Sequence, residues 1–308
     1  MPVVIALVIS IFFVTLFLVA FRSPTPHHLR VGLAAPAAVT GQIRRIAAER
    51  SPGALDLRSY PDPAAAQDAV QRRDVYAAVV VDNGGWTLLV AGANGSALAA
   101  ALQRQFTPVA SAAGARLAVR DVVPRAPGDK TGLAIFYAAF GLVLGGFLFG
   151  INTIQIAPRL GFWARMGSVA LFGPLCGVAA AAAGHTLDAL EGSFVVSAGI
   201  LTLIAAAVGV ATIMLLRLFG PFGITLGSML LLTLGNASSA AVFPPALLPG
   251  WLEPFAYALP PGAGVRALSG AAYFQGGGVV SGVAVLSAWI VISALIIFML
   301  DRRAPRHG

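Results

Sequence analysis

Long apolar stretches, separated by short polar segments, dominate the pattern of this chain of 308 residues. A helix needs roughly 20 apolar residues to cross a hydrocarbon layer about 30 Å thick. Six stretches come near that length, and only the third is short, so we expect it to extend toward Leu190. The pattern predicts a polytopic α-helical membrane protein with six transmembrane helices. The stretches are residues 3–21, 133–156, 167–184, 194–216, 221–242 and 279–300.

The charges of the C-terminal half avoid these stretches. Thr131 to Leu300 contain seven charged side chains, all between the stretches or at their ends, where charges cost least. The chain is 58% hydrophobic with a mean hydropathy of +0.85, which is rare in soluble proteins. The first stretch follows no basic residue and is too long for a secretory signal. We therefore expect an uncleaved anchor helix in a lipid bilayer.

Basic residues near the helix ends predict the orientation, because short loops rich in arginine stay in the cytoplasm. With a cytoplasmic N-terminus, six arginines fall on the inner side, against Arg266 alone in the short outer loops. The predicted localisation is the bacterial plasma membrane, with several passes and both termini cytoplasmic. The six inner arginines are Arg159, Arg165, Arg217, Arg302, Arg303 and Arg306.

Residues 22–130 follow a different pattern, which predicts an extracytoplasmic α/β domain inserted between the first two transmembrane helices. Asp62 and Pro63 form a typical helix start, and residues 82–85 predict a hairpin turn. A long helix from Ser96 should be interrupted near Pro108. Strands are expected at residues 29–33, 55–57, 75–81, 86–91 and 116–123, and the other helices at 37–50 and 63–73.

The α/β domain has 13 basic and 8 acidic side chains. The basic residues are scattered and have no aromatic residues between them, which excludes a nucleic-acid surface. We interpret them as an ordinary soluble surface in preference to an anion-binding site.

The C-terminal part, residues 131–308, is expected to be a five-helix transmembrane domain that packs through glycines. Small residues four apart let helix backbones approach closely inside a bilayer. We interpret them as packing positions in preference to a substrate path. The glycines are Gly141, Gly145, Gly146 and Gly150 in the second stretch, and Gly223 and Gly227 in the fifth.

Residues 244–278 form an external segment that is rich in proline and aromatic residues. This composition predicts short helices that lie at the membrane surface or dip into it, or an ordinary structured loop. Glu253 and Arg266 are candidates for an ion pair within it.

The sequence contains no evident set of catalytic residues. No Ser/His/Asp or Cys/His set shares a plausible location, and no cofactor or metal site is predicted. The phosphate-binding loop G-x-x-x-x-G-K-[ST] is absent, since the only lysine, Lys130, lacks the preceding glycines. The chain is therefore not expected to be an enzyme, and ATP hydrolysis would belong to a partner.

Two segments carry a resemblance to a known family. They are RDVYAAVVVD at residues 73–82, followed by AGANG at 91–95, and LPPGAGVRALSGAAYF at 259–274. With the order of helices, they make the chain similar to the membrane subunits of type-2 ABC exporters, in their phage-infection-protein-like branch. That family usually has a further helix before the first span, and this sequence begins at the span.

The resemblance implies a homodimer that pairs with a cytoplasmic ATPase and moves an amphipathic or lipid-like molecule outward. It also implies that the loop at residues 157–167 meets the ATPase through Arg159, Phe162, Trp163 and Arg165. The alternative is a non-transporting envelope receptor or scaffold, whose external domain binds a partner and whose helices serve as an anchor.

Overall fold

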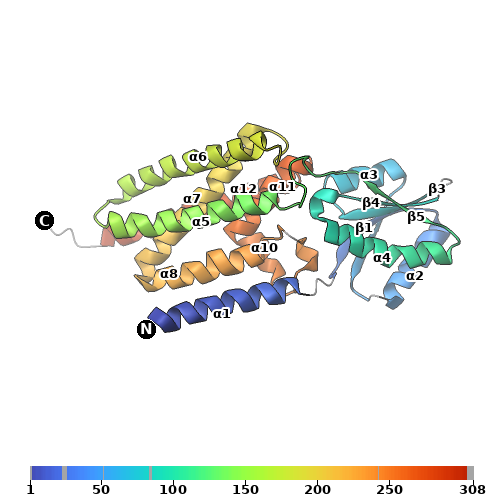
Figure 1. The fold of residues 1–308 in the computed structure, drawn as a ribbon, viewed down its shortest axis with the longest axis horizontal. Helices are drawn as coiled ribbons and strands as arrows, with labels where there is room; N and C mark the ends of the chain where they lie inside the picture. Colours follow the sequence, from blue (N-terminus) through green and yellow to red (C-terminus); the bar gives the residue numbers. More distant parts are fainter. Residues whose placement is uncertain (1, 23–25, 51, 83–84, 242, 304–308) are drawn as a thin grey trace.

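The computed structural model describes residues 2–22, 26–50, 52–82, 85–241 and 243–303. It consists of a helical lobe and an α/β lobe placed end to end (Figure 1). Asn83 and Gly84 of the expected hairpin turn lie outside the described residues, and so does Arg306 of the expected cytoplasmic tail.

The α/β lobe is built on a five-stranded sheet in the order β2-β1-β3-β4-β5. The neighbours β3 and β4 are antiparallel, and the other neighbours are parallel. A strand lies in each of the five expected places, and the apolar run expected to be covered on both faces forms the central strand, β3. The strands are β1 (Leu29–Ala34), β2 (Leu55–Ser59), β3 (Ala77–Asp82), β4 (Gly85–Val90) and β5 (Leu117–Asp121).

Helices cover both faces of this sheet. Val79 of β3 packs with residues of α2 and α4, while its neighbour Val80 packs on the opposite face with α3, as the alternation of side chains along a strand requires. The expected start of α3 is present, since the backbone N–H of Ala65 donates to Asp62 Oδ1 over 2.8 Å. The helices are α2 (Ala37–Arg50), α3 (Pro63–Gln71) and α4 (Ser96–Ala112), the last preceded by the 3₁₀ turn η1 (Gly92–Asn94).

The expected break at Pro108 is wrong, because α4 runs through this residue. Proline removes one backbone hydrogen bond near the end of the helix. Phe106, Val109 and Ala110, on either side of it, are buried in the core of the lobe. Their burial offsets the lost hydrogen bond and keeps the helix continuous.

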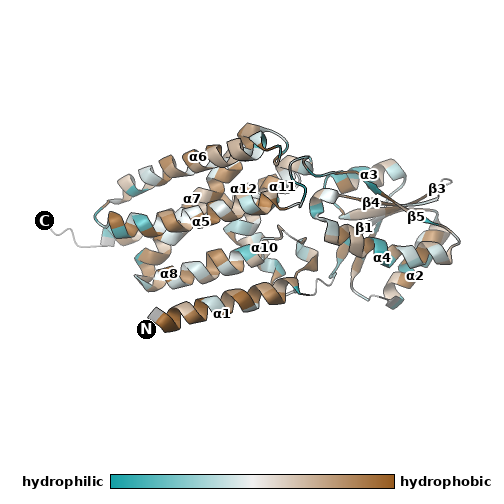
Figure 2. Cartoon of the chain, in the orientation of Figure 1, coloured by the Kyte–Doolittle hydropathy of each residue, from teal (hydrophilic) through white to brown (hydrophobic). Residues whose placement is uncertain are grey.

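Within the described residues, five helices of the helical lobe are long and apolar enough to cross a membrane. The central one, α7, is buried along most of its length and contacts α5, α6 and α12. The outer helices expose large apolar side chains, such as Leu7, Leu171 and Val280, over a surface that suits lipid. Figure 2 shows this apolar character along α1. The five are α1 (Pro2–Phe21), α5 (Ala134–Ile156), α6 (Phe162–Thr186), α7 (Phe194–Phe219) and α12 (Val279–Arg303).

The fifth apolar stretch forms a shorter helix than expected. It covers 16 residues, from Phe222 to Ala237, and so rises only about 24 Å, less than the hydrocarbon thickness of about 30 Å. Its middle is a wide π turn, in which Thr233 Oγ1 donates to the carbonyl of Ser228 five residues earlier. Its parts are α8 (Phe222–Gly227), the π segment η2 (Ser228–Leu234) and α9 (Gly235–Ala237).

The third stretch extends in the direction opposite to the expected one. Helix α6 ends at Thr186, short of Leu190, and instead begins early, at Phe162. Arg165 therefore lies inside the helix, where its Nη1 pairs with Asp301 Oδ2 over 3.5 Å. Arg217 pairs with the same carboxylate. Asp301, at the end of α12, thus compensates the charge of Arg165 within an otherwise apolar helix.

One end of the helical lobe collects the segments that were expected to face the cytoplasm. The start of α1, the turn between α5 and α6, the turn between α7 and α8, and the end of α12 all lie away from the α/β lobe (Figure 1). The structure thus places the inner arginines of the described chain at one end. That this end faces the cytoplasm remains a prediction.

The segment at residues 244–278 is folded into the junction of the two lobes. It forms η3 (Pro245–Leu247), α10 (Glu253–Ala258) and α11 (Pro260–Tyr273). Helix α11 is almost wholly buried against α7 and α12. The expected pair of Glu253 and Arg266 is not among the ion pairs of the described residues. Arg266 donates instead to the carbonyl oxygen of Ala256, over 3.2 Å.

Candidate functional site

Among the described residues, apolar contacts join the lobes on both faces of the sheet. Phe274, which follows α11, is fully buried among Val70 and Val75 of the α/β lobe. On the other face of the sheet, Leu247 of η3 is buried in the cluster that contains Leu98 of α4. Side chains of the helical lobe therefore complete both cores of the α/β lobe, and the junction has a defined geometry.

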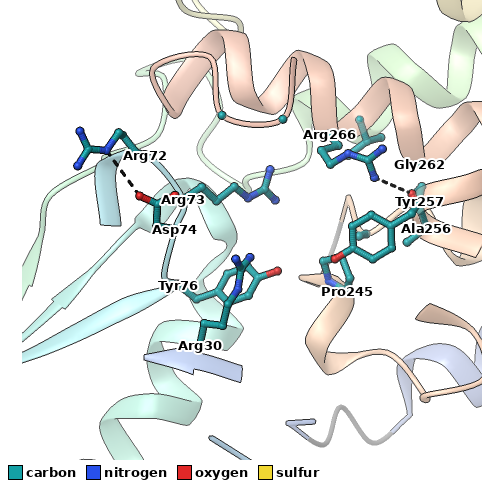
Figure 3. Close-up of a pocket in the computed structure, with 15 residues that line it drawn as sticks. Arg30, Arg72, Arg73, Asp74, Tyr76, Pro245, Ala256, Tyr257, Gly262 and Arg266 are labelled. Carbon is teal, nitrogen blue, oxygen red and sulfur yellow. Dashed lines mark hydrogen bonds and ion pairs between the residues drawn. The ribbon is translucent and has the colours of Figure 1, made fainter. Parts of the chain in front are cut away.

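A cavity of about 220 Å³ lies at this junction. Arg30 of β1, Arg73 after α3 and Tyr76 before β3 line it from the α/β lobe, and Tyr257 of α10 and Arg266 of α11 line it from the helical lobe. Figure 3 shows Arg73 and Arg266 approaching from opposite sides and the two tyrosine rings facing each other across the space. The lining thus combines positive charge with phenol groups.

The local fold that positions Arg73 is unusual. Helix α3 ends in a Schellman motif, in which the N–H of Arg73 donates to Val70 O over 3.1 Å and the N–H of Asp74 donates to Ala69 O over 2.9 Å. Arg73 occupies the left-handed position of this motif with φ of 64°, where glycine is usual. A side chain there costs about 1–2 kcal/mol. Such strained residues concentrate at functional sites.

The guanidinium of Arg73 lies in a largely desolvated setting. It stacks 4.8 Å from the ring centre of Phe274, and its Nη1 donates to Ser269 Oγ over 3.4 Å. Burial lowers the pKa of Arg73, while Tyr76 and Tyr257 act in the opposite direction. Arginine nevertheless keeps its proton in proteins. Arg73 therefore brings a full positive charge to the cavity.

Arg266 is held in a similar way from the other lobe. Its guanidinium stacks 4.9 Å from the ring centre of Tyr257, and its Nε is buried without a hydrogen-bond partner among the described residues. Burial lowers the pKa of Arg266, and the neighbouring Arg73 adds to this, whereas Tyr257 raises it. Two like charges, Arg73 and Arg266, therefore line the same cavity.

The charges around the cavity do not balance. Its lining has four arginines and one aspartate, Asp74, which pairs with the exposed Arg72 over 3.6 Å. No ion pair of the described residues involves Arg30, Arg73 or Arg266. These three arginines are half-buried, and charges that are withdrawn from water are ordinarily paired. Guanidinium groups bind carboxylates and phosphates through two parallel hydrogen bonds. The cavity therefore fits an anion.

Arg73, one of the arginines interpreted as soluble surface, lies between the lobes, and Arg266 belongs to a buried helix. Anion binding by these residues was the less favoured interpretation of the sequence, and it stays a hypothesis. No short motif joins them, because Arg73 contacts a residue 196 positions away. The one signal in the sequence is that both segments that carry the family resemblance, residues 73–82 and 259–274, contribute side chains to the cavity.

The four residues predicted to contact an ATPase differ in accessibility. Arg159 lies in the turn before α6, and Trp163, in the first turn of α6, is 79% exposed. Phe162 packs edge-to-face against Phe298 of α12. Arg165 is only 1% exposed, and its pairing with Asp301 turns it into the lobe. ATPase contact by the four residues remains a prediction.

The predicted packing glycines fall into two groups. A side chain on Gly146 or Gly150 would collide with α7, since a Cβ would lie 2.7 Å from Ala205 O or 2.6 Å from Thr212 Cβ. Gly223 and Gly227 are equally tight, against Leu215 and Phe147. At Gly141 and Gly145 a Cβ would meet nothing closer than 3.9 Å. A side chain at Gly141 would meet no described residue, and one at Gly145 would only reach van der Waals contact with Phe172 of α6, because the other face of α5 is turned toward α7.

No protein-family model matches this chain, and no curated protein or solved structure matches it significantly.

Proposed function

We propose that this protein is the permease-like membrane subunit of an ABC-type exporter, which moves an amphipathic or lipid-like molecule out of the cell. A separate cytoplasmic chain would hydrolyse the ATP. The proposal includes six membrane-embedded helical segments and an extracytoplasmic α/β lobe. The observation that carries it is the arginine-lined cavity where the apolar helices meet the polar lobe. A polar head that leaves the bilayer outward would pass this place.

The helical lobe supports a route along its surface. Helix α7 fills the centre of the lobe, so an amphiphile would move between copies or along a groove that faces lipid. A groove of about 470 Å³ runs between α5 and α6, lined mainly by apolar residues such as Leu142, Ala180 and Leu190. A small polar cavity shares Arg73 with the junction cavity and Asp129 with this groove. Head and tail of one amphiphile thus have adjoining places.

The proposed active form is a homodimer. Gly141 lies on an open face of α5, where Gly145 meets only Phe172, and such small-residue faces suit close contact between membrane helices. Two copies that meet near this face would enclose the groove between α5 and α6, since Gly141 also lines it. Substrate would then be released when the copies part.

Co-purification and transport test this function together. Tagged protein in mild detergent should bring down an ATPase, and vesicles with both proteins should export an amphiphile only when ATP is supplied. Arg159→Ala and Trp163→Ala should weaken the pairing by at least about fivefold, as expected when an exposed contact residue costs about 1 kcal/mol. Arg104→Ala, an exposed arginine of the α/β lobe, is the matched control. Absence of both the ATPase and the ATP-dependent transport would exclude the exporter.

The scaffold alternative is favoured by one observation, the interlocking of the lobes through Phe274 and Leu247. A scaffold needs this rigidity, whereas a transporter needs a part that moves. Under the scaffold hypothesis the full-length protein captures an envelope partner, brings down no ATPase, and is unaffected by Arg159→Ala. The same pull-down therefore separates the two classes of function.

A further inference from the structure

We propose that the junction cavity is a phosphate-binding site, in which Arg30, Arg73 and Arg266 hold the phosphate between the two lobes. This inference deepens the proposed function, because it assigns a phosphate head to the exported amphiphile, and it rests on that function only for the role of the ligand. Phosphate binding by itself requires neither ATPase nor transport.

Each of the three arginines in the cavity has N–H donors that are not used by hydrogen bonds among the described residues. A guanidinium carries five N–H donors. Among the hydrogen bonds of the described residues, the side chain of Arg73 makes one, to Ser269, that of Arg266 makes one, to Ala256, and that of Arg30 makes none. Donors from all three therefore remain for a ligand. Hydrogen bonds from charged donors to a phosphate are among the strongest that proteins form.

The phenol groups of Tyr76 and Tyr257 add further hydrogen-bond donors to the lining of the cavity. Burial raises the pKa of Tyr257, and Tyr76 and Glu253 add to this effect. The phenol is therefore fully protonated at neutral pH and able to donate. Tyr76 is only 5% exposed. The guanidinium of Arg30 stacks on the Tyr76 ring, 5.5 Å from the ring centre. The stacking holds the guanidinium of Arg30 at the wall of the cavity.

Charge and shape favour phosphate over a carboxylate. Three guanidinium groups without a carboxylate partner surround the space, while a carboxylate offers one negative charge and two oxygens. A phosphate group carries up to two negative charges at neutral pH and three acceptor oxygens. A phosphate therefore has one oxygen for each arginine, with Arg30 and Arg73 on the side of the α/β lobe and Arg266 on the opposite side (Figure 3). Among the described residues that line the cavity, the one carboxylate is Asp74, which is exposed and pairs with Arg72, so it does not compensate the site.

The size of the cavity limits what can be bound inside it. Sites for whole drug-sized molecules have volumes of about 300–1,000 Å³, and this cavity has about 220 Å³. It therefore takes the phosphate head, and any apolar remainder must lie outside. A lipid phosphate and free inorganic phosphate present the same chemistry to the arginines. The experiment must distinguish these two sources.

The test measures binding to the purified full-length protein in detergent, by calorimetry. The probes are dihexanoyl phosphatidic acid and inorganic phosphate, with sulfate and acetate for comparison. The variants are Arg73→Gly, which relieves the left-handed backbone, and Arg266→Gln. Arg104→Gln removes an exposed arginine of the same lobe and is the control. Thermal unfolding of each variant shows that it is folded, and Arg73→Lys retains the charge without the two parallel hydrogen bonds.

We expect one equivalent of a phosphate probe to bind, with an affinity at least about tenfold lower in Arg73→Gly and Arg266→Gln. Arg73→Lys should fall between them and the unchanged protein, and Arg104→Gln should bind normally. Binding of phosphatidic acid alone identifies a lipid head, and equal binding of inorganic phosphate identifies a free-phosphate site. Each result supports the inference.

The inference is overturned if neither phosphate probe binds, if acetate binds as tightly, or if Arg104→Gln loses as much affinity as the cavity variants. Its failure can be told from failure of the exporter. If phosphate binds but no ATPase partner is found, the phosphate site is supported and the export function is contradicted. If transport is driven by ATP but no phosphate probe binds, the export function is supported and the phosphate site is contradicted.

Discussion

Arg73 adopts a backbone conformation that is unfavourable for a residue with a side chain. The Schellman motif at the end of α3 needs a left-handed residue at this position, and arginine fills it with φ of 64°. Glycine adopts this conformation without a steric cost. The side chain that is retained there points into the cavity and stacks on Phe274. The local cost is consistent with a role of this side chain between the lobes.

A pair of variants isolates that cost. Arg73→Gly and Arg73→Ala both remove the side chain, but only glycine relaxes the left-handed backbone. We expect Arg73→Gly to be more stable than Arg73→Ala by about 1 kcal/mol, measured by chemical unfolding in detergent. The same pair at Arg72, whose φ is −86°, should show no advantage for glycine. Equal stability of the two Arg73 variants would contradict the assigned backbone.

Asp301 is the second residue whose role depends on its partners. It receives both Arg165, which is 1% exposed, and Arg217. Asp301→Asn would leave two like charges facing each other in a half-buried place, so we expect a loss of about 3 kcal/mol in the free energy of unfolding. Asp56→Asn, which breaks the exposed pair with Arg58, should cost less than about 1 kcal/mol. Similar losses for both variants would contradict the pairing of Asp301 with Arg165 and Arg217.

At the scale of elements, the faces of α5 differ in what they contact. Gly146 and Gly150 admit the backbone of α7, while Gly141 faces open space. Gly150→Leu should destabilise the protein by about 1–3 kcal/mol through overpacking, as measured by thermal unfolding in detergent. Gly141→Leu should leave the stability of a single copy unchanged. If both variants unfold alike, the packing of α5 on α7 is not as described.

The Gly141→Leu variant also bears on the proposed dimer. Because the side chain would stand on the open face of α5, we expect it to lower the dimer fraction without harming the fold. Sedimentation or mass photometry in detergent would show the change. A dimer that persists unchanged would place the contact between copies elsewhere.

At the scale of the whole molecule, the two lobes should lie on different sides of a lipid boundary. We expect Arg104→Cys, on the exposed side of α4, to react with an impermeant thiol reagent in intact cells. Trp163→Cys, at the other end of the helical lobe, should react only after permeabilisation. Both changes are made with Cys176→Ser, since Cys176 is half-buried in α6. The reverse pattern would invert the orientation and with it the proposed direction of transport.

The sequence alone determined those features that depend on neighbours along the chain. The long apolar runs became the long helices, the continuous run before Asp82 became the central strand, and Asp62 capped α3 as its spacing indicated. The reason is that helix length, strand alternation and capping are set within a few residues. The same local signals were insufficient for α6, which begins early and so includes Arg165, a residue that pairs with a carboxylate 136 residues away.

Only the tertiary structure decided which charges are buried and which surfaces meet. Pro108 stays within α4 because the sheet holds the side chains around it, and one face of α5 is filled while the other is open. Arg30, Arg73 and Arg266 lie far apart in sequence, and packing of Phe274 and Leu247 between the lobes brings them to one cavity. Desolvation and unbalanced charge arise from that packing, so no local pattern could have predicted them.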